Sequence, residues 1–303
     1  MMTLISQYLR ASVAAMLAIV AFSGVIPAAS AAPPAHALRV VAVERVYGDL
    51  ARQLGGPAVD VITLLNSPSA DPHAYEATPR DADAVAAADI VIENGLGYDA
   101  FADKLVAASP KRGRSLLDVG TLGGHRLGDN PHVWYQTASL RTFSDALFAE
   151  LARRDGNDRT DLERRHETLD AWIASFAKRL AAVGKRHPAA RVAITEPVFD
   201  YILKSAGVSI ATPSSFSHAI EEGNDPAPQD VETMRGLLAN RQVAAFVYNV
   251  QTVEPSTSRL LAVASAARVT VVPITETLPA NERTQHWMER ELTALDRALL
   301  GAP

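Results

Sequence analysis

Cysteine is absent from the 303-residue sequence. Without thiols the protein cannot form disulfide bonds, thiolate metal sites, iron–sulfur clusters or cysteine nucleophiles. An excess of positive charge is also absent, because the formal net charge is −5 at pH 7, so the composition offers no basic surface for nucleic acid. The remaining composition, 48% hydrophobic and 21% charged residues, is typical of a globular protein. Its length allows two domains with sizeable cores.

A hydrophobic run long enough to span a bilayer is missing as well. Residues 11–26 are uncharged, but about 16 residues fall short of the ~20 that a transmembrane helix needs. Arg10 precedes this run, and small residues lead from it to Ala31, which is the three-part pattern of a secretory signal peptide. We therefore expect a signal peptide over 1–31, cleaved near Ala31, and a disordered segment over 32–37. Because no cysteine follows to carry a lipid, the sequence predicts an unanchored periplasmic protein with no transmembrane segment in the mature chain.

The motifs of common hydrolases and nucleotide-binding enzymes are missing too. The sequence has no His-Glu-x-x-His pair for a zinc protease and no Gly-x-Ser-x-Gly nucleophile elbow. It also lacks a glycine-rich phosphate-binding loop. These absences remove the usual signs of an enzyme.

What the sequence does contain is an alternation of short apolar runs and helical patterns, which is typical of α/β proteins. A long helical stretch interrupts the alternation, with apolar residues near a 3.6-residue period between Leu162 and Val183. We predict an α/β fold with two Rossmann-like lobes, 38–155 and 188–303, joined by a single long, rigid helix over 156–187. The strands are predicted at 38–44, 59–65, 89–94, 190–195, 243–249 and 269–274.

Three details of these elements are predicted from local signals. Thr160 and Glu163 form a capping box near the start of the long helix. Gly184 and Pro188 are expected to end it. Residues 211–230 are interpreted as a long polar loop.

Polar residues with metal-binding side chains follow several of the predicted strands. His73 and His132 each follow a proline preceded by Asp or Asn, which places them on stiffened backbone. Glu196 and Glu276 follow strands of the second lobe. Ligands of open α/β sheets bind outside the carboxyl ends of the strands, and two imidazoles with two carboxylates suit a divalent first-row metal.

Taken singly, each of these four residues has an ordinary explanation as a turn histidine or a solvated strand end. Their common position, on the edges where the two lobes face each other, favours a metal cleft between the lobes. Whether Glu44 or His218 also contributes stays open at this point.

Several longer stretches resemble one known family. The segments VVAVERVYGDLARQLGG, DPHAYEATPRDADAVAAADIVIENGLGYDAF, NPHVWY, TEPVFDYILKSAG and ITETLP are similar to motifs of the zinc/manganese-type (cluster A-I) solute-binding proteins of bacterial ABC importers. They occur in the family's order, from about residue 39 to 298. The resemblance implies two lobes bridged by one long helix, with the metal held between them.

The resemblance also implies a ligand set, a function and partners. His73 and His132 match the first two family ligands, and Glu196 matches the third, which is glutamate in many manganese-type members. Glu276 stands where the family usually has aspartate, which is a departure. The implied function is capture of Zn²⁺ or Mn²⁺, without enzymatic activity, by a monomer that delivers the ion to the permease of an ABC importer with its ATPase.

Some questions remain open at the level of sequence. Two carboxylate ligands favour manganese or ferrous iron. The affinity of such sites for divalent ions nevertheless rises toward zinc, so zinc and manganese both remain candidate ions. A siderophore or haem binder of related architecture is one alternative function. A periplasmic metallohydrolase, with water as a fourth ligand, is another.

Overall fold

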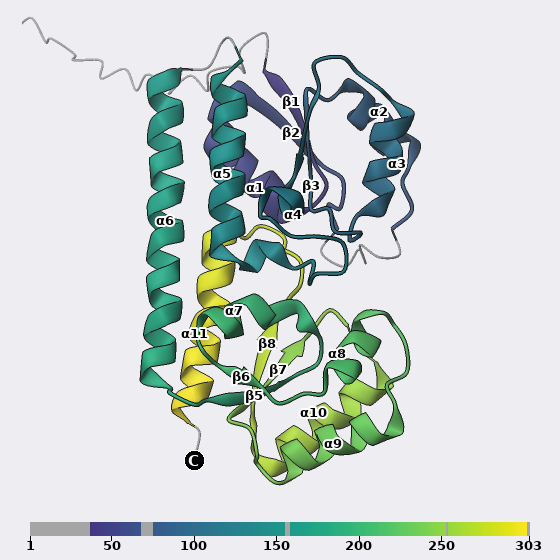
Figure 1. The fold of residues 1–303 in the computed structure, drawn as a ribbon, viewed down its shortest axis with the longest axis vertical. Coiled ribbons are helices and arrows are strands. Elements are labelled where there is room, and N and C mark those ends of the chain that lie inside the picture. Colours follow the sequence, from purple (N-terminus) through teal and green to yellow (C-terminus); the bar gives the residue numbers. More distant parts are fainter. Residues whose placement is uncertain (1–36, 68–74, 155–157, 253, 302–303) are drawn as a thin grey trace, which may run out of the picture. The chain divides into compact units, whose positions relative to one another are not determined.

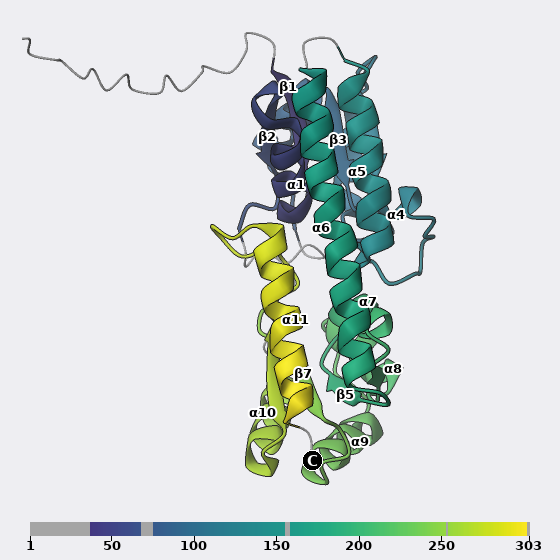
Figure 2. The ribbon, with the colours of Figure 1, turned by 90° about the vertical axis from the view of Figure 1, so that its left-hand side faces the viewer.

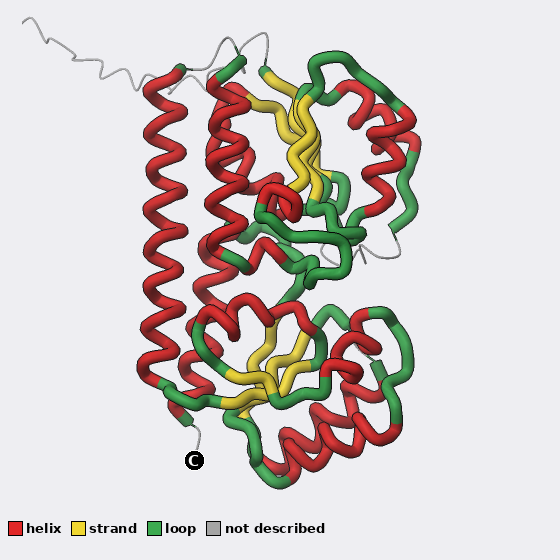
Figure 3. Tube along the Cα trace, in the orientation of Figure 1, coloured by secondary structure: helices red, strands yellow, loops and turns green. Residues whose placement is uncertain are grey.

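The computed structural model describes residues 37–67, 75–154, 158–252 and 254–301. These residues all belong to one compact unit. They form two α/β lobes (Figures 1 and 3). Each lobe is built on a parallel sheet of four strands. Within this part of the chain, no helix combines the length and the apolar character needed to cross a bilayer.

The first lobe contains the sheet β2-β1-β3-β4. Its strands are β1 (Leu38–Ala42), β2 (Val59–Thr63), β3 (Ile90–Glu93) and β4 (Ser115–Asp118), and its helices are α1 (Arg45–Gly55), α2 (Pro79–Ala87), α3 (Ala100–Ala108), α4 (Val119–Leu122) and α5 (Thr137–Ala152). The central strands β1 and β3 read as continuous apolar runs because helices cover both faces of the sheet. In this strand order β2 lies on one side of β1, and β3 and β4 lie on the other. The topological switch point is therefore between β1 and β3, and α/β proteins bind ligands at such points.

The second lobe repeats this arrangement with the sheet β6-β5-β7-β8. Its strands are β5 (Arg191–Ile194), β6 (Ser209–Ile210), β7 (Ala245–Asn249) and β8 (Thr270–Ile274), and its helices are α7 (Asp200–Ser205), α8 (Ser214–Glu221), α9 (Pro228–Ala239), α10 (Pro255–Ala267) and α11 (Thr284–Leu300). Here the switch point lies between β5 and β7. Both switch points place strand ends where the lobes meet.

The long helix α6 (Arg159–Arg186) joins the lobes. It packs against α1 and α5 of the first lobe and against α7 and α11 of the second (Figure 2). Its inner face, from Leu162 to Val183, is buried in a cluster that also contains strand residues of both sheets, such as Val40 and Val192. The predicted long helix and two-lobe α/β fold are therefore confirmed.

The ends of α6 differ from the prediction. The N-cap is Asp158, whose side chain accepts hydrogen bonds from the backbone N–H groups of Thr160 and Asp161 at 3.0 and 3.2 Å. Gly184 lies inside the helix and does not end it. A Cβ at this position would clash with the carbonyl oxygen of Ala206, so the glycine permits close packing against the end of α7.

Several short elements were not predicted from the sequence, among them the helices α4 and α8 and the strands β4 and β6. Residues 214–221, within the predicted polar loop, form helix α8, which buries Phe216 and Ile220 on one face. The strands β4 and β6 are also new, and they are only 4 and 2 residues long. Neither strand contains more than two consecutive apolar residues, so no apolar run identifies them in the sequence.

Candidate metal centre

His132 reaches the space between the lobes from the segment that joins α4 to the turn Val133–Tyr135. Its side chain is fully buried. The Oδ1 atom of Asn130 accepts hydrogen bonds from the His132 backbone N–H at 2.9 Å and from its Nδ1 at 2.7 Å. Because Asn130 can only accept at Oδ1, the proton sits on Nδ1. This tautomer leaves the lone pair of Nε2 available to a metal.

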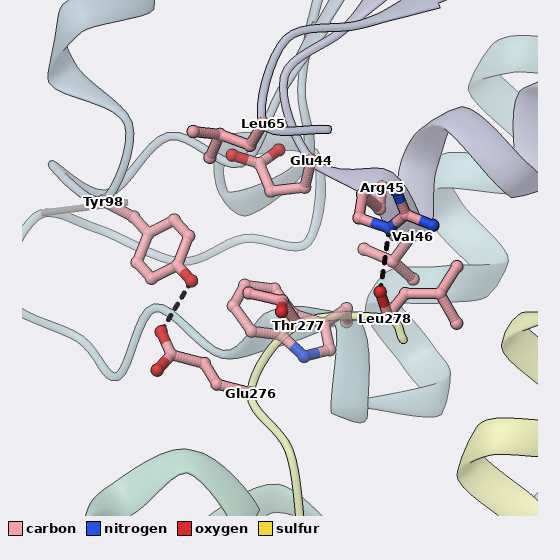
Figure 4. Close-up of a pocket in the computed structure, with 9 residues that line it drawn as sticks. Glu44, Arg45, Val46, Leu65, Tyr98, Glu276, Thr277 and Leu278 are labelled. Carbon is pink, nitrogen blue, oxygen red and sulfur yellow. Dashed lines mark hydrogen bonds between the residues drawn. The ribbon is translucent and has the colours of Figure 1, made fainter. Parts of the chain in front are cut away.

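Glu276 approaches this imidazole from the other lobe. It lies just after β8, and its Oε1 atom is 3.6 Å from His132 Nε2. The hydroxyl group of Tyr98, from the first lobe, donates a hydrogen bond of 2.6 Å to the same oxygen (Figure 4). Gln251 fixes the backbone, since its Oε1 accepts from the N–H groups of Glu276 and Thr277 at 2.6 and 2.9 Å. The carboxylate is therefore held beside His132 from both lobes.

Glu196 lies directly after β5, at the switch point of the second sheet. It is 4% exposed, and its Oε2 atom has no hydrogen-bond partner within the described residues. Burial and then the charge of Glu276 raise the pKa of Glu196 to about 7, although the side chains of Asn249 and Thr252 favour the carboxylate. A buried carboxyl group with a free oxygen next to a second carboxylate is a setting in which a cation is stabilising.

The pKa of His132 reflects the same carboxylates. Burial lowers this pKa, but the neighbouring Glu276, and then Glu221 and Glu196, raise it above the ordinary value of 6.5. Negative charge therefore dominates around the imidazole. A divalent cation would relieve the repulsion among these carboxylates and replace the proton that they attract.

The four predicted ligands have different outcomes. His132 and Glu276 lie side by side, and Glu196 interacts electrostatically with both. His73 belongs to residues 68–74, which lie outside the described residues. The structure thus brings together one imidazole and two carboxyl groups from opposite lobes, and the assignment of all four residues as metal ligands stays a prediction.

Two acidic residues near His132 were missed by the sequence analysis. The Oε1 atom of Glu221, at the end of α8, lies 3.7 Å from His132 Nδ1. Asp200, at the start of α7, has an Oδ1 atom with no hydrogen-bond partner in the described part of the chain, and burial raises its pKa to about 6. The apolar pair at 216 and 220, four residues apart, was the available signal that Glu221 belongs to a helix.

Glu44 and His218 were the two open candidates. Glu44 is 6% exposed and borders the same narrow pocket as Tyr98 and Glu276 (Figure 4). Burial, followed by the charge of Asp99, raises its pKa well above the ordinary value, which favours the protonated form of Glu44. The ring of His218 is exposed, and its Nδ1 bonds to the carbonyl oxygen of Ser214 in its own helix at 2.8 Å. Neither residue faces His132 as Glu276 does.

A second group with metal-ligand chemistry lies elsewhere, between α5 and α6. Asp145, His166 and Asp170 place their ligand atoms within 4.8 Å of one another. His166 Nε2 lies 2.9 Å from Asp145 Oδ1, and Arg141 forms an ion pair of 3.1 Å with Asp170. Asp145 is more than half exposed. These ion pairs account for the group without a metal, and it serves below as a control.

Comparison with known proteins finds relatives in sequence and in fold. The chain is 25% identical over 215 residues to the iron-binding protein YfeA of Yersinia pestis, an alignment that covers 67% of this chain and 68% of YfeA. The structure of FpvC from Pseudomonas aeruginosa in complex with Mn²⁺ matches with a TM-score of 0.71 and 20% identity, over 88% of this chain and 99% of that chain. The periplasmic zinc-binding protein TroA from Treponema pallidum gives 0.70 and 18%, over 86% and 98%. At these identities the structural matches show a shared fold.

The family comparison goes beyond the fold. Residues 40–298 match the model of the family described as "Zinc-uptake complex component A periplasmic". This range includes the long helix, all four predicted ligands and nearly all of both lobes. Members of this family are solute-binding proteins of metal importers and not enzymes. The chain therefore belongs to the zinc-uptake complex component A family of periplasmic metal-binding proteins.

Proposed function

We propose that this protein captures a single Zn²⁺ or Mn²⁺ ion in the periplasm and delivers it to the permease of an ABC importer. Residues 1–31 would direct export and be removed near Ala31. The mature chain would act as a monomer, with lobes 38–155 and 188–303 connected by the helix at 156–187. The permease and its ATPase would then move the ion across the membrane.

The observation that carries this proposal is the meeting of His132 and Glu276 across the two lobes. Nε2 of His132 and Oε1 of Glu276 are 3.6 Å apart, which is a spacing that two ligands of one first-row ion can share at metal–ligand distances of about 2.0–2.2 Å. Glu196 adds a second carboxyl group with a free oxygen. We propose His73 as the fourth ligand, which gives two imidazoles and two carboxylates.

The charges of this ligand set suit a divalent ion. Two neutral imidazoles and two carboxylates balance a charge of +2, so the occupied site is neutral and tolerable when buried. Ligands from both lobes also mean that the ion itself links the lobes. Metal binding therefore stabilises the arrangement of the lobes in which ligands from both contact the ion.

Zinc and manganese are both consistent with this ligand set. Carboxylate oxygens suit manganese, whereas affinity in the divalent series rises toward zinc for almost any nitrogen and oxygen site. The relatives point in the same two directions, since TroA is described as zinc-binding and FpvC was solved with Mn²⁺. YfeA is described as iron-binding, which adds ferrous iron as the third ion to test.

A direct titration tests the proposed function. The mature protein, residues 32–303, is stripped of metal and titrated with zinc and with manganese in competition with a chelator. We expect one ion per chain with a Kd below about 1 µM, corresponding to roughly −8 kcal/mol or better. His132→Ala should abolish this binding. The matched control is His166→Ala, which removes the imidazole of the group between α5 and α6 and should leave the tight site intact.

The titration can also contradict the proposal. A parent protein that binds neither ion more tightly than about 1 µM does not carry metal for import. Loss of the tight site in His166→Ala, with retention in His132→Ala, would place the site between α5 and α6 instead.

A further inference from the structure

Tyr98 connects the two lobes at the candidate metal centre. It lies in the turn that follows β3, its side chain is 3% exposed, and its hydroxyl group donates a hydrogen bond of 2.6 Å to Glu276 Oε1. The two residues are 178 positions apart in the sequence. Figure 4 shows the phenol pointing across the pocket to the Glu276 carboxylate. A side chain of the first lobe thus contacts a candidate ligand of the second.

The ring of Tyr98 also contacts His132, the candidate ligand that lies beside Glu276. Its edge-to-face partner is the imidazole of His132, with ring centroids 6.0 Å apart. Trp134 packs against Tyr98 at 5.2 Å and against His132 at 5.2 Å. These three rings form a buried aromatic group in which the position of the phenol is fixed relative to the imidazole.

Hydrogen bonds also fix the backbone of the turn that carries Tyr98. The Asp99 carboxylate accepts hydrogen bonds from the N–H groups of Asn94 at 2.6 Å and Gly95 at 2.9 Å. Gly95 and Gly97 have φ angles of 73° and 83°, a conformation that glycine adopts without steric cost. The turn therefore presents the hydroxyl group at a set place, independent of the second lobe.

Glu276 needs such a partner more than a shorter ligand would. A glutamate side chain has three rotatable bonds, and holding it in one rotamer costs conformational entropy. Tyr98 holds Oε1, and this same oxygen is the one 3.6 Å from His132 Nε2. Hydrogen-bond donors to ligating carboxylates orient them for the metal.

We propose that Tyr98 is a positioning residue that sets the Glu276 carboxylate against His132 before the metal arrives. This proposal rests on the proposed function. It assigns Tyr98 no direct bond to the ion. By holding a ligand of the opposite lobe, Tyr98 makes the metal site a pre-organised one and slows the release of a bound ion.

The test removes only the hydroxyl group. Tyr98→Phe keeps the ring against Trp134 and His132, and we expect its zinc affinity to fall about tenfold or more, as for other partners of metal-ligating side chains. The loss should appear mainly as faster zinc dissociation into excess chelator. The matched control is Tyr75→Phe, which removes a phenol hydroxyl bonded at 2.9 Å to a different carboxylate, that of Asp81, and should leave zinc affinity unchanged.

A double-mutant cycle separates positioning from a general structural role. In the Glu276→Ala background, Tyr98→Phe should cause no further loss of zinc affinity, because the carboxylate that it positions is gone. Equal zinc affinity in the parent and Tyr98→Phe overturns the proposal. An equal loss in both backgrounds also overturns it, since Tyr98 would then act independently of Glu276. If the parent itself binds no zinc, the proposed function fails first and this proposal with it.

Discussion

Glu196, Glu221 and Glu276 surround one buried imidazole with carboxyl groups. Each is largely removed from water, and the charge of Glu276 is among the causes that raise the pKa of Glu196. Without a cation, protons bound by these groups relieve the repulsion among the carboxylates. At the scale of single residues, the site is therefore a place where protons and metal ions compete.

This competition predicts how metal affinity depends on pH. His132, whose pKa is raised above 6.5, and Glu196, whose pKa is about 7, must both lose their protons to bind the ion. Zinc affinity should therefore fall as the pH drops from 8 to 6, by about tenfold per pH unit for each group that is protonated. Competition titrations between pH 8.5 and 5.5 measure this slope. In Glu196→Gln the slope should be shallower, and an affinity that does not change over this range would contradict the competition.

Glu93 provides a separate test in the first lobe, away from the candidate ligands. It is 3% exposed at the end of β3, and burial, with the charges of Asp99, Asp103 and Asp118, raises its pKa from 4.5 to about 8. Between these values the folded protein binds this proton and the unfolded chain does not. The free energy of unfolding must therefore fall as the pH rises from about 4.5 to about 8.

Replacing Glu93 by glutamine removes this dependence. Metal-free Glu93→Gln should be more stable than the metal-free parent at pH 8.5, and the difference should shrink toward pH 5. Urea unfolding of both proteins at several pH values measures it. A variant that is less stable than the parent at pH 8.5 would show that the carboxyl group is stabilised there by something other than its proton.

At the scale of elements, the candidate site depends on the segments that follow strands. The end of β7 and the segment after it support both carboxylates of the second lobe, since Asn249 and Thr252 favour the charge of Glu196, and Gln251 holds the backbone at Glu276. In the first lobe, the turn after β3 carries Tyr98. Rigid strands thus place side chains whose contacts cross from one lobe to the other.

Helix α11 receives its N-terminal cap from the other lobe. Oδ2 of Asp49, on α1, accepts hydrogen bonds from the backbone N–H of Thr284 at 2.8 Å and from its hydroxyl group at 2.7 Å. Gln53 and Gln285 bond to each other beside this contact at 2.7 and 3.0 Å. The N-cap residue Arg283 makes no side-chain cap of its own. This contact therefore joins the two lobes at a second place, in addition to α6.

The cap predicts a measurable loss of stability. Asp49→Ala leaves the first N–H group of α11 and the buried Thr284 hydroxyl without this acceptor, so the free energy of unfolding should fall by about 1–2 kcal/mol. The control is Glu167→Ala at an exposed position of α6, where a change within about 0.5 kcal/mol is expected. Denaturant unfolding compares the two variants. Equal stability of Asp49→Ala and the parent would mean that the contact with α11 contributes nothing.

At the scale of the whole molecule, the two lobes have the same strand order. That architecture was predictable because its signals are local and repeated. Apolar runs such as that of β3 and the 3.6-residue period of α6 are long enough to identify an element from sequence. The rule that ligands lie past strand ends then selected Glu196 and Glu276 as candidates, and the Asn-Pro-His pattern selected His132.

The rest of the site was not predictable because its contacts are not local. Nothing near Tyr98 in the sequence indicates a partner 178 residues away. Glu221 was hidden because the helix that carries it has 8 residues and begins at a proline-serine segment typical of loops. Asn130 lies two residues before His132 in the sequence, yet its role in fixing the His132 tautomer depends on the rotamer of its side chain. These details depend on packing between segments that are distant in sequence, and hydrophobic periodicity carries no information about such packing.

The central claim, that imidazoles and carboxylates of opposite lobes hold one ion, is tested most directly by a crystal structure of the zinc-loaded mature protein. Anomalous scattering at the zinc edge would locate the metal independently of the protein density. The account predicts one fully occupied peak about 2.0–2.2 Å from nitrogen atoms of His73 and His132 and from carboxylate oxygens of Glu196 and Glu276. A zinc peak elsewhere, with His132 and Glu276 still 3.6 Å apart and no metal between them, would contradict it.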